Sequence, residues 1–381
     1  MGYTDAEFIY LNENDMITAG VSDMGRCIHT MEEMFDLVTR GDYRMGGATA
    51  NEHGIKITFP DTSDIKGMPL NEPDRRFMAM PAYLGGKFHL VGNKMYGSNQ
   101  KNAEKGLPRS ILMLTLMDVD TGMPLAYMSA NILSAMRTAA VTGLGTKYLA
   151  KKDPESVAIV GPGVMGRYAM DAFMETQPSL QTIKIKGRGT RNIDHFISHC
   201  KKRYPQIKNY TVCDSIQKAC ENTDIIYFGT TNAAAFEDNP NIEEEWIKPG
   251  CLVISVSALR VKTDFIAKEK CKLVTDSYHL YESWGMNQKF PTQKHVSSLL
   301  GLGFYDAVCE GKIEKTDITD IGDIITAKKP GRESDEQIVI YAIGGMPIED
   351  VAWGYECYLQ AKNKHIGTKL KIWDTSELMK E

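Results

Sequence analysis

"ESVAIVGPGVMGRYAMDAFME", residues 155–175, is the stretch that decides the fold of one of the two domains expected in this chain. It reads as five apolar strand residues, a glycine turn and then a helix. Gly161, Gly163 and Gly166 have the spacing GxGxxG. The first glycine permits a tight turn, the second lets the backbone approach a pyrophosphate, and the third lets the helix pack closely on the strand. The pattern predicts a dinucleotide site, and an empty glycine turn is the alternative.

Further strand-like runs follow this turn and alternate with helical stretches: "TIKIK", "DIIYFGTT", "CLVISVS" and "KLVTD". Such alternation indicates an α/β fold with a Rossmann-type, doubly wound parallel sheet, which we expect over residues 151–331. The helix that starts after the glycine turn offers free N–H groups and a positive dipole end to phosphates. Besides the three glycines, the residues expected to contact the cofactor are Val164, Met165, Arg188, Thr190, Arg191, Thr230, Thr231, Ser255 and Ser257.

The second strand of this domain carries information on the kind of dinucleotide. Sites for NAD place an Asp or Glu about 20 residues after the glycines, where it binds the ribose hydroxyls. Gly187 occupies that place here, with Arg188, Thr190 and Arg191 just beyond it. The acid that would repel a 2′-phosphate is missing, and cations that suit one are present. We therefore expect NADP(H) to be preferred, with NAD(H) possible; the alternative is that Arg188 stacks on adenine or faces water.

The composition narrows the class of protein. The chain has 381 residues, 43% hydrophobic and 24% charged, which is typical of a soluble globular protein of two domains. A net charge of -5 argues against nucleic acid as a partner. There is no apolar run long enough for a membrane helix, and the acidic N-terminus lacks the regions of a signal peptide, so we expect a cytoplasmic protein without membrane attachment. The eight cysteines include no CxxC pair, and no metal site is expected.

A second helix, "SANILSAMRTAAVTGLGTKYLA" at residues 129–150, places Arg137 among small and apolar residues. Burying an unpaired charge costs several kcal/mol, so this guanidinium needs a partner. One interpretation is an internal ion pair. The interpretation we favour is that the partner lies outside the chain and is the carboxylate of a ligand.

Several motifs together resemble one protein family. They are "MPAY" (80–83), "NKMYG" (93–97), "SAMRTAAVTGLGTKYL" (134–149), "GPGVMG" and "GRESDEQIVIYAIGGMPIEDVA" (331–352). The chain resembles the ornithine cyclodeaminase/mu-crystallin family over roughly residues 25–375. That family also includes bacterial alanine dehydrogenases, ketimine reductases and opine-type dehydrogenases.

The resemblance implies a homodimer built from two-domain subunits. Residues 1–150 together with 332–381 would form an α+β domain that binds substrate and joins the subunits, and the dinucleotide domain is inserted between these parts. Residues 334–362 read as an apolar strand and a long helix, enough to cross back to the first domain. The substrate would lie in the cleft.

The resemblance also implies a set of site residues. In the family an Arg before the glycine domain, a Lys and the "RTAA" Arg hold an α-carboxylate and polarise the reacting C–N centre. By motif the Lys is Lys94 and the latter Arg is Arg137. The first Arg is Arg44, or alternatively Arg75 or Arg76, because a long stretch peculiar to this chain, over residues 45–76, intervenes. Lys94 either shuttles a proton to nitrogen or acts only as a third electrostatic clamp.

Two positions depart from the cyclodeaminases. The acid that receives the distal amine of the substrate is replaced by Met78, and the Asp that acts as base near the nicotinamide is replaced by Ala258. Neither residue accepts a proton, which argues against cyclisation of ornithine. The stretch 45–76 is polar and is expected to form loops at the cleft, with a substrate-specific lid as its functional interpretation. Its His53, Asp61, Asp64, Glu72 and Asp74 fit no metal-binding spacing.

The predicted function is an NAD(P)H-dependent oxidoreductase that acts on the C–N bond of a small amino or imino acid. This covers ketimine or imine reductases and amino-acid or opine-type dehydrogenases. One alternative is an ammonia lyase like ornithine cyclodeaminase, with bound NAD as a redox shuttle. The other is a non-catalytic protein that binds a small ligand in the presence of NADPH, as mu-crystallin does.

Overall fold

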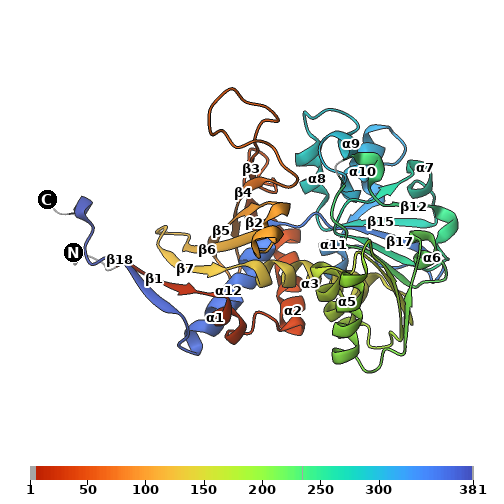
Figure 1. Cartoon of the computed structure of the whole chain (residues 1–381), viewed down its shortest axis with the longest axis horizontal. Helices are drawn as coiled ribbons and strands as arrows, with labels where there is room; N and C mark the ends of the chain where they lie inside the picture. Colours follow the sequence, from red (N-terminus) through yellow and green to blue (C-terminus); the bar gives the residue numbers. More distant parts are fainter. Residues whose placement is uncertain (1–5, 234, 380–381) are drawn as a thin grey trace. The chain divides into compact units, whose positions relative to one another are not determined.

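The computed structural model describes residues 6–233 and 235–379. Its contacts divide these residues into two compact units. The first unit comprises residues 6–23, 40–137 and 346–379, and the second comprises 24–39, 138–233 and 235–345. Figure 1 shows the elements of both units along the chain.

An eight-stranded sheet forms the centre of the first unit, in the order β18-β1-β7-β6-β5-β4-β2, with β3 paired to β4. Neighbouring strands are antiparallel, except that β1 and β7 run parallel. The strands are β1 (Ala6–Leu11), β2 (Tyr43–Met45), β3 (Ile55–Ile57), β4 (Arg76–Leu84), β5 (Leu90–Ser98), β6 (Ser110–Asp118), β7 (Pro124–Ser129) and β18 (Thr368–Trp373).

One face of this sheet, the inner face, is covered by helix α12 (Pro347–Asn363), and α1 (Glu13–Thr18) packs beside it. Along β4 the residues Met78, Met80, Ala82 and Leu84 alternate inward and are buried, as the pleat requires. The helix approaches the sheet closely at Gly92, where an added Cβ would lie 2.6 Å from the side chain of Val351. Glycine is needed there because any larger residue would push the helix away.

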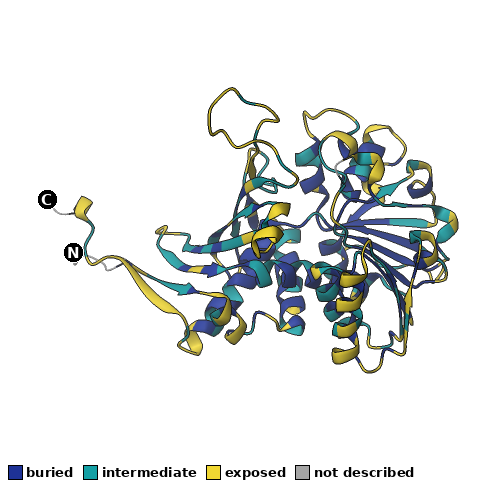
Figure 2. Ribbon diagram, in the orientation of Figure 1, coloured by how far each residue is buried: buried dark blue, intermediate teal, exposed yellow. Residues whose placement is uncertain are grey.

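The opposite, outer face of the same sheet carries large apolar side chains that are exposed. Strand β18 is exposed along its whole length (Figure 2). Exposed apolar residues that alternate onto this face come from five strands: Phe77, Met95, Ile111, Tyr127, Leu370 and Ile372. A wide apolar surface of this kind is uncommon on a monomer.

The second unit contains an eight-stranded sheet in which every neighbouring pair is parallel, in the order β10-β9-β8-β11-β13-β17-β15-β16. After β8, the strands β9 and β10 are added on one side of it, and β11 and the later strands are added on the other, so the strand order reverses between β8 and β11. This confirms the predicted doubly wound α/β fold. The strands are β8 (Ser156–Val160), β9 (Thr182–Lys186), β10 (Asn209–Val212), β11 (Ile225–Phe228), β13 (Leu252–Ser255), β15 (Cys271–Thr275), β16 (Ile318–Asp320) and β17 (Ile338–Ala342).

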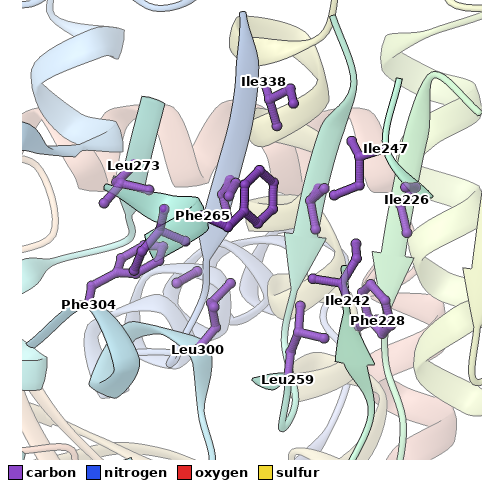
Figure 3. Packing of buried hydrophobic residues seen from close by; sticks show 14 of the residues in the cluster. Ile226, Phe228, Ile242, Ile247, Leu259, Phe265, Leu273, Leu300, Phe304 and Ile338 are labelled. Carbon is purple, nitrogen blue, oxygen red and sulfur yellow. The ribbon is translucent and has the colours of Figure 1, made fainter. Parts of the chain in front are cut away.

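Helices cover the second sheet, and a small pair of strands, β12 (Asn241–Ile242) and β14 (Arg260–Val261), lies beside it. Figure 3 shows Ile226, Phe228 and Ile338 from the strands in one apolar core with Phe265 and Phe304 from helices. The remaining α-helices of the chain are α2 (Met24–Arg40), α3 (Asn131–Leu149), α4 (Val164–Thr176), α5 (Thr190–Arg203), α6 (Ile216–Cys220), α7 (Thr263–Ile266), α8 (Tyr278–Gly285), α9 (Thr292–His295), α10 (Leu300–Cys309) and α11 (Ile321–Ile325). Short 3-10 helices span Gln100–Lys105, Phe236–Asp238, Glu244–Trp246, Lys315–Asp317 and Glu377–Met379.

The structure corrects the predicted boundaries between the domains. Strand β17 pairs with β13 and β15 in the second unit, so the chain returns to the first unit at Met346 and not at residue 332. All five residues of β17 are buried, which suits a strand inside a parallel sheet that is covered on both faces. Residues 24–39 also group with the second unit, although the sequence placed them in the first domain.

In the described part of the chain, no helix combines the length and the apolar character needed to cross a bilayer.

Candidate active site

Four charged side chains are buried together in the first unit, and we call them the buried charge cluster: Lys94, Arg137, Glu349 and Asp350. Their exposed fractions are 2%, 6%, 0% and 0%. Lys94 lies in the middle of β5, where it pairs with Met80 and Leu114 and therefore points to the inner face. Arg137 comes from α3, and the two acids lie in the first turn of α12. Buried charges of this kind are stable only when they are paired.

Asp350 links the two cations of the cluster. Lys94 Nζ donates a hydrogen bond of 2.6 Å to Asp350 Oδ2, and Arg137 Nε donates one of 3.2 Å to Asp350 Oδ1. Arg137 Nη1 donates to Glu349 Oε2, and Ser134 Oγ lies 3.3 Å from both Lys94 Nζ and Arg137 Nη2. Two positive and two negative groups are therefore paired in the interior of the first unit.

This arrangement corrects the expectation that the partner of Arg137 lies outside the chain. The guanidinium has internal partners, Glu349 and Asp350, more than two hundred residues further along the chain. Binding of a substrate carboxylate by Arg137 stays a prediction, and such a ligand would have to share the guanidinium with these acids. The sequence did contain a signal for them, because "PIEDVA" places two adjacent acids among apolar residues at the start of a helix.

Burial and ion pairing have opposite effects on the pKa values of the cluster: burial disfavours the charged form of each side chain, and pairing favours it. Burial lowers the pKa of Lys94 to about 8, although Asp350 partly offsets this effect. Burial also disfavours the charged form of Arg137, but Asp350 and Glu349 outweigh it and raise the pKa of the guanidinium. The pKa of Asp350 is lowered because Arg137 and Lys94 outweigh the effect of its burial. With a pKa of about 8, Lys94 can exchange a proton near neutral pH.

Arg44 is not brought to this cluster. It pairs with Tyr83, which alternates onto the outer face, whereas Lys94 pairs with Met80 on the inner face. Arg44 is exposed, and its Nη1 donates a hydrogen bond of 3.1 Å to the carbonyl oxygen of Gly41. The side chains of Arg44 and Lys94 therefore leave the sheet on opposite faces.

The two alternatives to Arg44 are Arg76 and Arg75, and they differ in their position relative to the face of Lys94. Arg76 opens β4 and pairs with Ser98, four residues after Lys94 on the same inner face. Arg75 precedes the strand; it pairs with Glu72 and donates to the carbonyl oxygen of Leu70. Of the arginines considered from the sequence besides Arg137, Arg76 shares the face of Lys94.

The glycine turn lies at the carboxyl ends of β8, β9 and β11 and borders a pocket of about 480 Å3. Gly161 has φ +99°, and an added Cβ would lie 2.6 Å from the carbonyl oxygen of Gly229. A Cβ on Gly163 would meet no atom within 4 Å, which leaves open space where α4 begins. Gly163 is the N-cap of α4 and has no side-chain cap, so the first N–H groups of the helix are available to phosphate. These residues fit a dinucleotide.

The predicted cofactor residues divide into two groups. Those that line the pocket are Gly161, Gly163, Arg188, Thr230 and Thr231. Ser255 and Ser257 are buried behind the lining. Ser257 Oγ accepts a hydrogen bond of 3.1 Å from the backbone N–H of Thr230, which lines the pocket. The others lie at the starts of α4 and α5, outside the lining: Val164, Met165, Gly166, Thr190 and Arg191. Lining residues that the sequence did not indicate include Asn192, Asn239 and Arg260.

A larger hollow of about 670 Å3 lies elsewhere in the second unit, beside Tyr148, Ile324 and Arg332. Arg332 Nε donates a hydrogen bond of 2.9 Å to the carbonyl oxygen of Leu149, at the end of α3. This guanidinium therefore satisfies a helix terminus. Of the two hollows, the smaller pocket holds the glycine turn and lies where the strand order reverses, so its residues are the ones that fit a dinucleotide.

The two positions that depart from cyclodeaminases are both buried. Met78 lies on the inner face of β4, two residues before Met80, which pairs with Lys94. Ala258 lies in the second unit, and its backbone N–H donates a hydrogen bond of 3.1 Å to Asn232 Oδ1. In residues 6–233 and 235–379, no group of three or more His, Cys, Asp or Glu side chains is arranged to hold a metal ion.

Comparison with known proteins agrees with this architecture. The model of the ornithine cyclodeaminase/mu-crystallin family matches residues 21–365. The N-((2S)-2-amino-2-carboxyethyl)-L-glutamate dehydrogenase of Staphylococcus aureus is 26% identical over 374 residues, covering 96% of this chain and 99% of the relative. The alanine dehydrogenase of Archaeoglobus fulgidus is 29% identical over 299 residues, covering 77% of this chain and 83% of the relative.

A solved structure shares the fold over nearly the whole chain. The Thermococcus litoralis Δ1-pyrroline-2-carboxylate reductase, in complex with NADH and L-proline, superposes with a TM-score of 0.74 at 23% identity, covering 95% of this chain and 99% of that one. The family match spans the strand that carries Lys94, the helix of Arg137 and the glycine turn. The chain therefore belongs to the ornithine cyclodeaminase/mu-crystallin family.

Proposed function

We propose that this protein is an NAD(P)H-dependent oxidoreductase that interconverts a small imino acid, or a keto acid with an amine, and the corresponding amino acid. The observation that carries the proposal is the buried charge cluster, in which a lysine of lowered pKa shares a carboxylate with an arginine. The second unit holds the dinucleotide at the glycine turn and the first unit holds the substrate. When bound, the cofactor supplies a hydride to the imine carbon.

The protein's own residues have separate tasks in this reaction. Arg137 binds the α-carboxylate of the substrate, because a guanidinium matches a carboxylate with two parallel hydrogen bonds. Lys94 Nζ, as an ammonium, donates a proton to the imine nitrogen, so that C=N becomes CH–NH when the hydride reaches carbon. Asp350 keeps Lys94 and Arg137 in place through its two oxygens. In the oxidative direction neutral Lys94 takes the proton back.

Ammonia-releasing cyclisation is less well supported by the residues present. It needs a group that deprotonates an amine and holds it as a nucleophile. Met78 and Ala258 stand where the cyclodeaminases have acids, and neither side chain accepts a proton. Among the possible oxidoreductases an opine-type dehydrogenase is favoured, because the Staphylococcus aureus dehydrogenase matches over 99% of its length.

A panel assay tests the proposal. The purified protein with NADPH or NADH is offered cyclic imino acids, and 2-oxo acids with ammonium or amino acids, and the absorbance at the nicotinamide band is followed. We expect loss of absorbance with at least one pair. Ammonia release from ornithine without net change in cofactor would support a lyase. Ligand-dependent thermal shifts without turnover in either assay would support a binding protein.

The pH dependence of the reaction follows from Lys94. Reduction needs the ammonium, so we expect kcat/KM for reduction to fall as the pH rises through about 8, where Lys94 loses its proton. Oxidation of the amino acid needs the neutral amine, so its kcat/KM should rise through the same pH. Rate profiles from pH 6 to 10 in both directions check this. Parallel profiles in the two directions would contradict proton transfer by Lys94 and leave it as an electrostatic clamp.

We further propose that NADP(H) is preferred over NAD(H). Arg188 lines the pocket directly after β9, and its Nη2 lies 3.4 Å from the carbonyl oxygen of Thr231. Replacing Arg188 with alanine should lower kcat/KM for NADPH about 10- to 100-fold, because a charge-assisted bond to the 2′-phosphate is lost. The value for NADH should change little. Steady-state kinetics with both cofactors measure this, and a wild-type preference for NADH would refute the proposal.

A second copy of the chain is the partner that we propose for the outer face of the first sheet. The exposed apolar side chains there include Met95, Ile111 and Tyr127, from three adjacent strands. Replacing Ile111 with glutamate would place a charge in a dry interface and should shift the protein from dimer to monomer. Sedimentation velocity measures the change, with Ile17→Glu, an exposed residue of α1, as the control. A wild-type monomer would contradict this proposal.

A further inference from the structure

The inner face of the first sheet continues past Lys94 with residues that the proposed reaction does not use. Two positions further along β5 lies Tyr96, which pairs with Met78, and two more lies Ser98, which pairs with Arg76. Strand β3 adds Lys56, which pairs with Met78. By the alternation of antiparallel strands, these side chains leave the sheet on the side of Lys94.

This half of the face, which we call the open half, is covered only in part, whereas the half before Lys94 lies under α12. The helix contacts β5 at Lys94 through Asp350 and at Gly92 through Val351. Beyond Lys94 the burial is uneven: Met78 and Ser98 are buried, but Lys56 on β3 is exposed. Leu114, which pairs with Lys94, is buried, but Leu112 and Tyr96 in the next row are only half-buried. The side of Lys94 toward Tyr96 is therefore the less covered direction along the sheet.

Positive charge gathers in this open half. The Arg76 guanidinium lies over the Tyr96 ring, 5.7 Å from its centroid, so an aromatic platform holds it. Asp74 accepts hydrogen bonds from Arg76, Arg109 and Ser98, so one carboxylate faces two guanidinium groups. Asp74 has φ +61°, a backbone conformation that a non-glycine residue adopts only where its surroundings hold it. With Lys56 added, cations outnumber the acid.

We infer that this open half of the inner face binds a second carboxylate of the substrate, with Arg76 as its principal ligand and Lys56 as a supporting charge. The inference rests on the proposed function for the first carboxylate and the C–N centre. Arg76 pairs with Ser98, four residues beyond Lys94, but its guanidinium lies over the ring of Tyr96. Tyr96 is two residues from Lys94 along β5, a span of about 6.7 Å, which suits the separation of two carboxylates in a short dicarboxylic acid. Substrates are then dicarboxylic amino or imino acids, and Arg76 determines that specificity.

Binding to the NADPH-loaded protein tests the inference without requiring turnover. Glutarate and pentanoate have the same five-carbon chain but carry two carboxylates and one. We expect glutarate to bind about 10- to 100-fold more tightly by isothermal titration calorimetry, the size of a charge-assisted contact. Arg76→Gln should remove the difference by weakening glutarate alone, and Arg76→Lys should restore part of it.

Two neighbouring arginines provide matched controls. Arg75→Gln removes the positive charge adjacent to Arg76 in the sequence, and Arg44→Gln removes one from the outer face of the sheet. Both variants should keep the preference for glutarate. If Arg76→Gln does not fold, as judged by circular dichroism, Lys56→Gln replaces it in the test, and we expect it to reduce the preference for glutarate by a smaller factor.

The outcomes separate this inference from the proposed function. Equal binding of the two acids by the wild type, no binding of either, or a preference that survives Arg76→Gln would overturn the second carboxylate site. A preference for glutarate that depends on Arg76, in a protein that oxidises no NADPH with any imine, would keep the site and reject the oxidoreductase.

Discussion

Replacement of Asp350 with alanine is expected to destabilise the first unit by about 3–5 kcal/mol, the cost of leaving buried cations without their counter-ion. Asp350 is fully buried and accepts hydrogen bonds from both Lys94 and Arg137. Without it, Arg137 keeps its hydrogen bond to Glu349, whereas the remaining hydrogen bond of Lys94 within the described residues is the one to the hydroxyl of Ser134. Urea unfolding followed by circular dichroism measures the loss.

A surface ion pair supplies the control for this prediction. Asp374 pairs with Lys371, but 83% of its side chain is exposed, so Asp374→Ala should leave the free energy of unfolding unchanged. The double variant Lys94→Met/Asp350→Leu should recover much of the stability, because apolar residues that replace a buried ion pair are often tolerated. If Asp350→Ala unfolds at the same urea concentration as the wild type, the cluster does not contribute to stability as we describe.

Replacement of Lys94 with methionine is expected to reduce kcat about 10²- to 10⁴-fold, the contribution of a positioned acid or base. Methionine keeps the length and apolar contacts of the lysine stem but cannot carry a proton. NADPH binding, measured by fluorescence titration, should stay close to the wild-type value because the cofactor pocket is lined by residues of the second unit.

The control for this variant is Lys87→Met. Lys87 lies just before β5, is half-exposed and pairs with Glu356 on α12. It should lose no activity. Turnover of Lys94→Met near the wild-type rate, with an unaltered pH profile, would show that another group moves the proton.

Much of the second unit could be predicted from local sequence. Its signals are short in range: an apolar run buried on both faces, a glycine turn and a helix start lie within the residues 155–175. The family was recognised in the same way, from motifs such as "SAMRTAA". The boundary at residue 332 was wrong because an apolar strand fits either sheet by composition, and only its pairing with β13 and β15 assigns it.

The cluster was predicted only in part. Lys94 and Arg137 were identified by motif, and the structure places both on Asp350. The sequence indicated Arg44 as the first carboxylate clamp, with Arg75 or Arg76 as alternatives, because the stretch over residues 45–76 intervenes. The face onto which a side chain points depends on strand register, which local sequence does not carry. The register places Arg76 on the side of Lys94 and Arg44 on the other.

The sequence by itself determined the doubly wound fold, the glycine turn and the presence of Lys94 and Arg137, because each depends on residues adjacent in the chain. The tertiary structure alone decided what those two cations contact. Their partners, Glu349 and Asp350, lie more than two hundred residues away and meet them because α12 packs on the inner face of a sheet whose register turns Lys94 inward. The stability of a buried charge depends on the groups that surround it, and folding brings those groups together from distant parts of the chain.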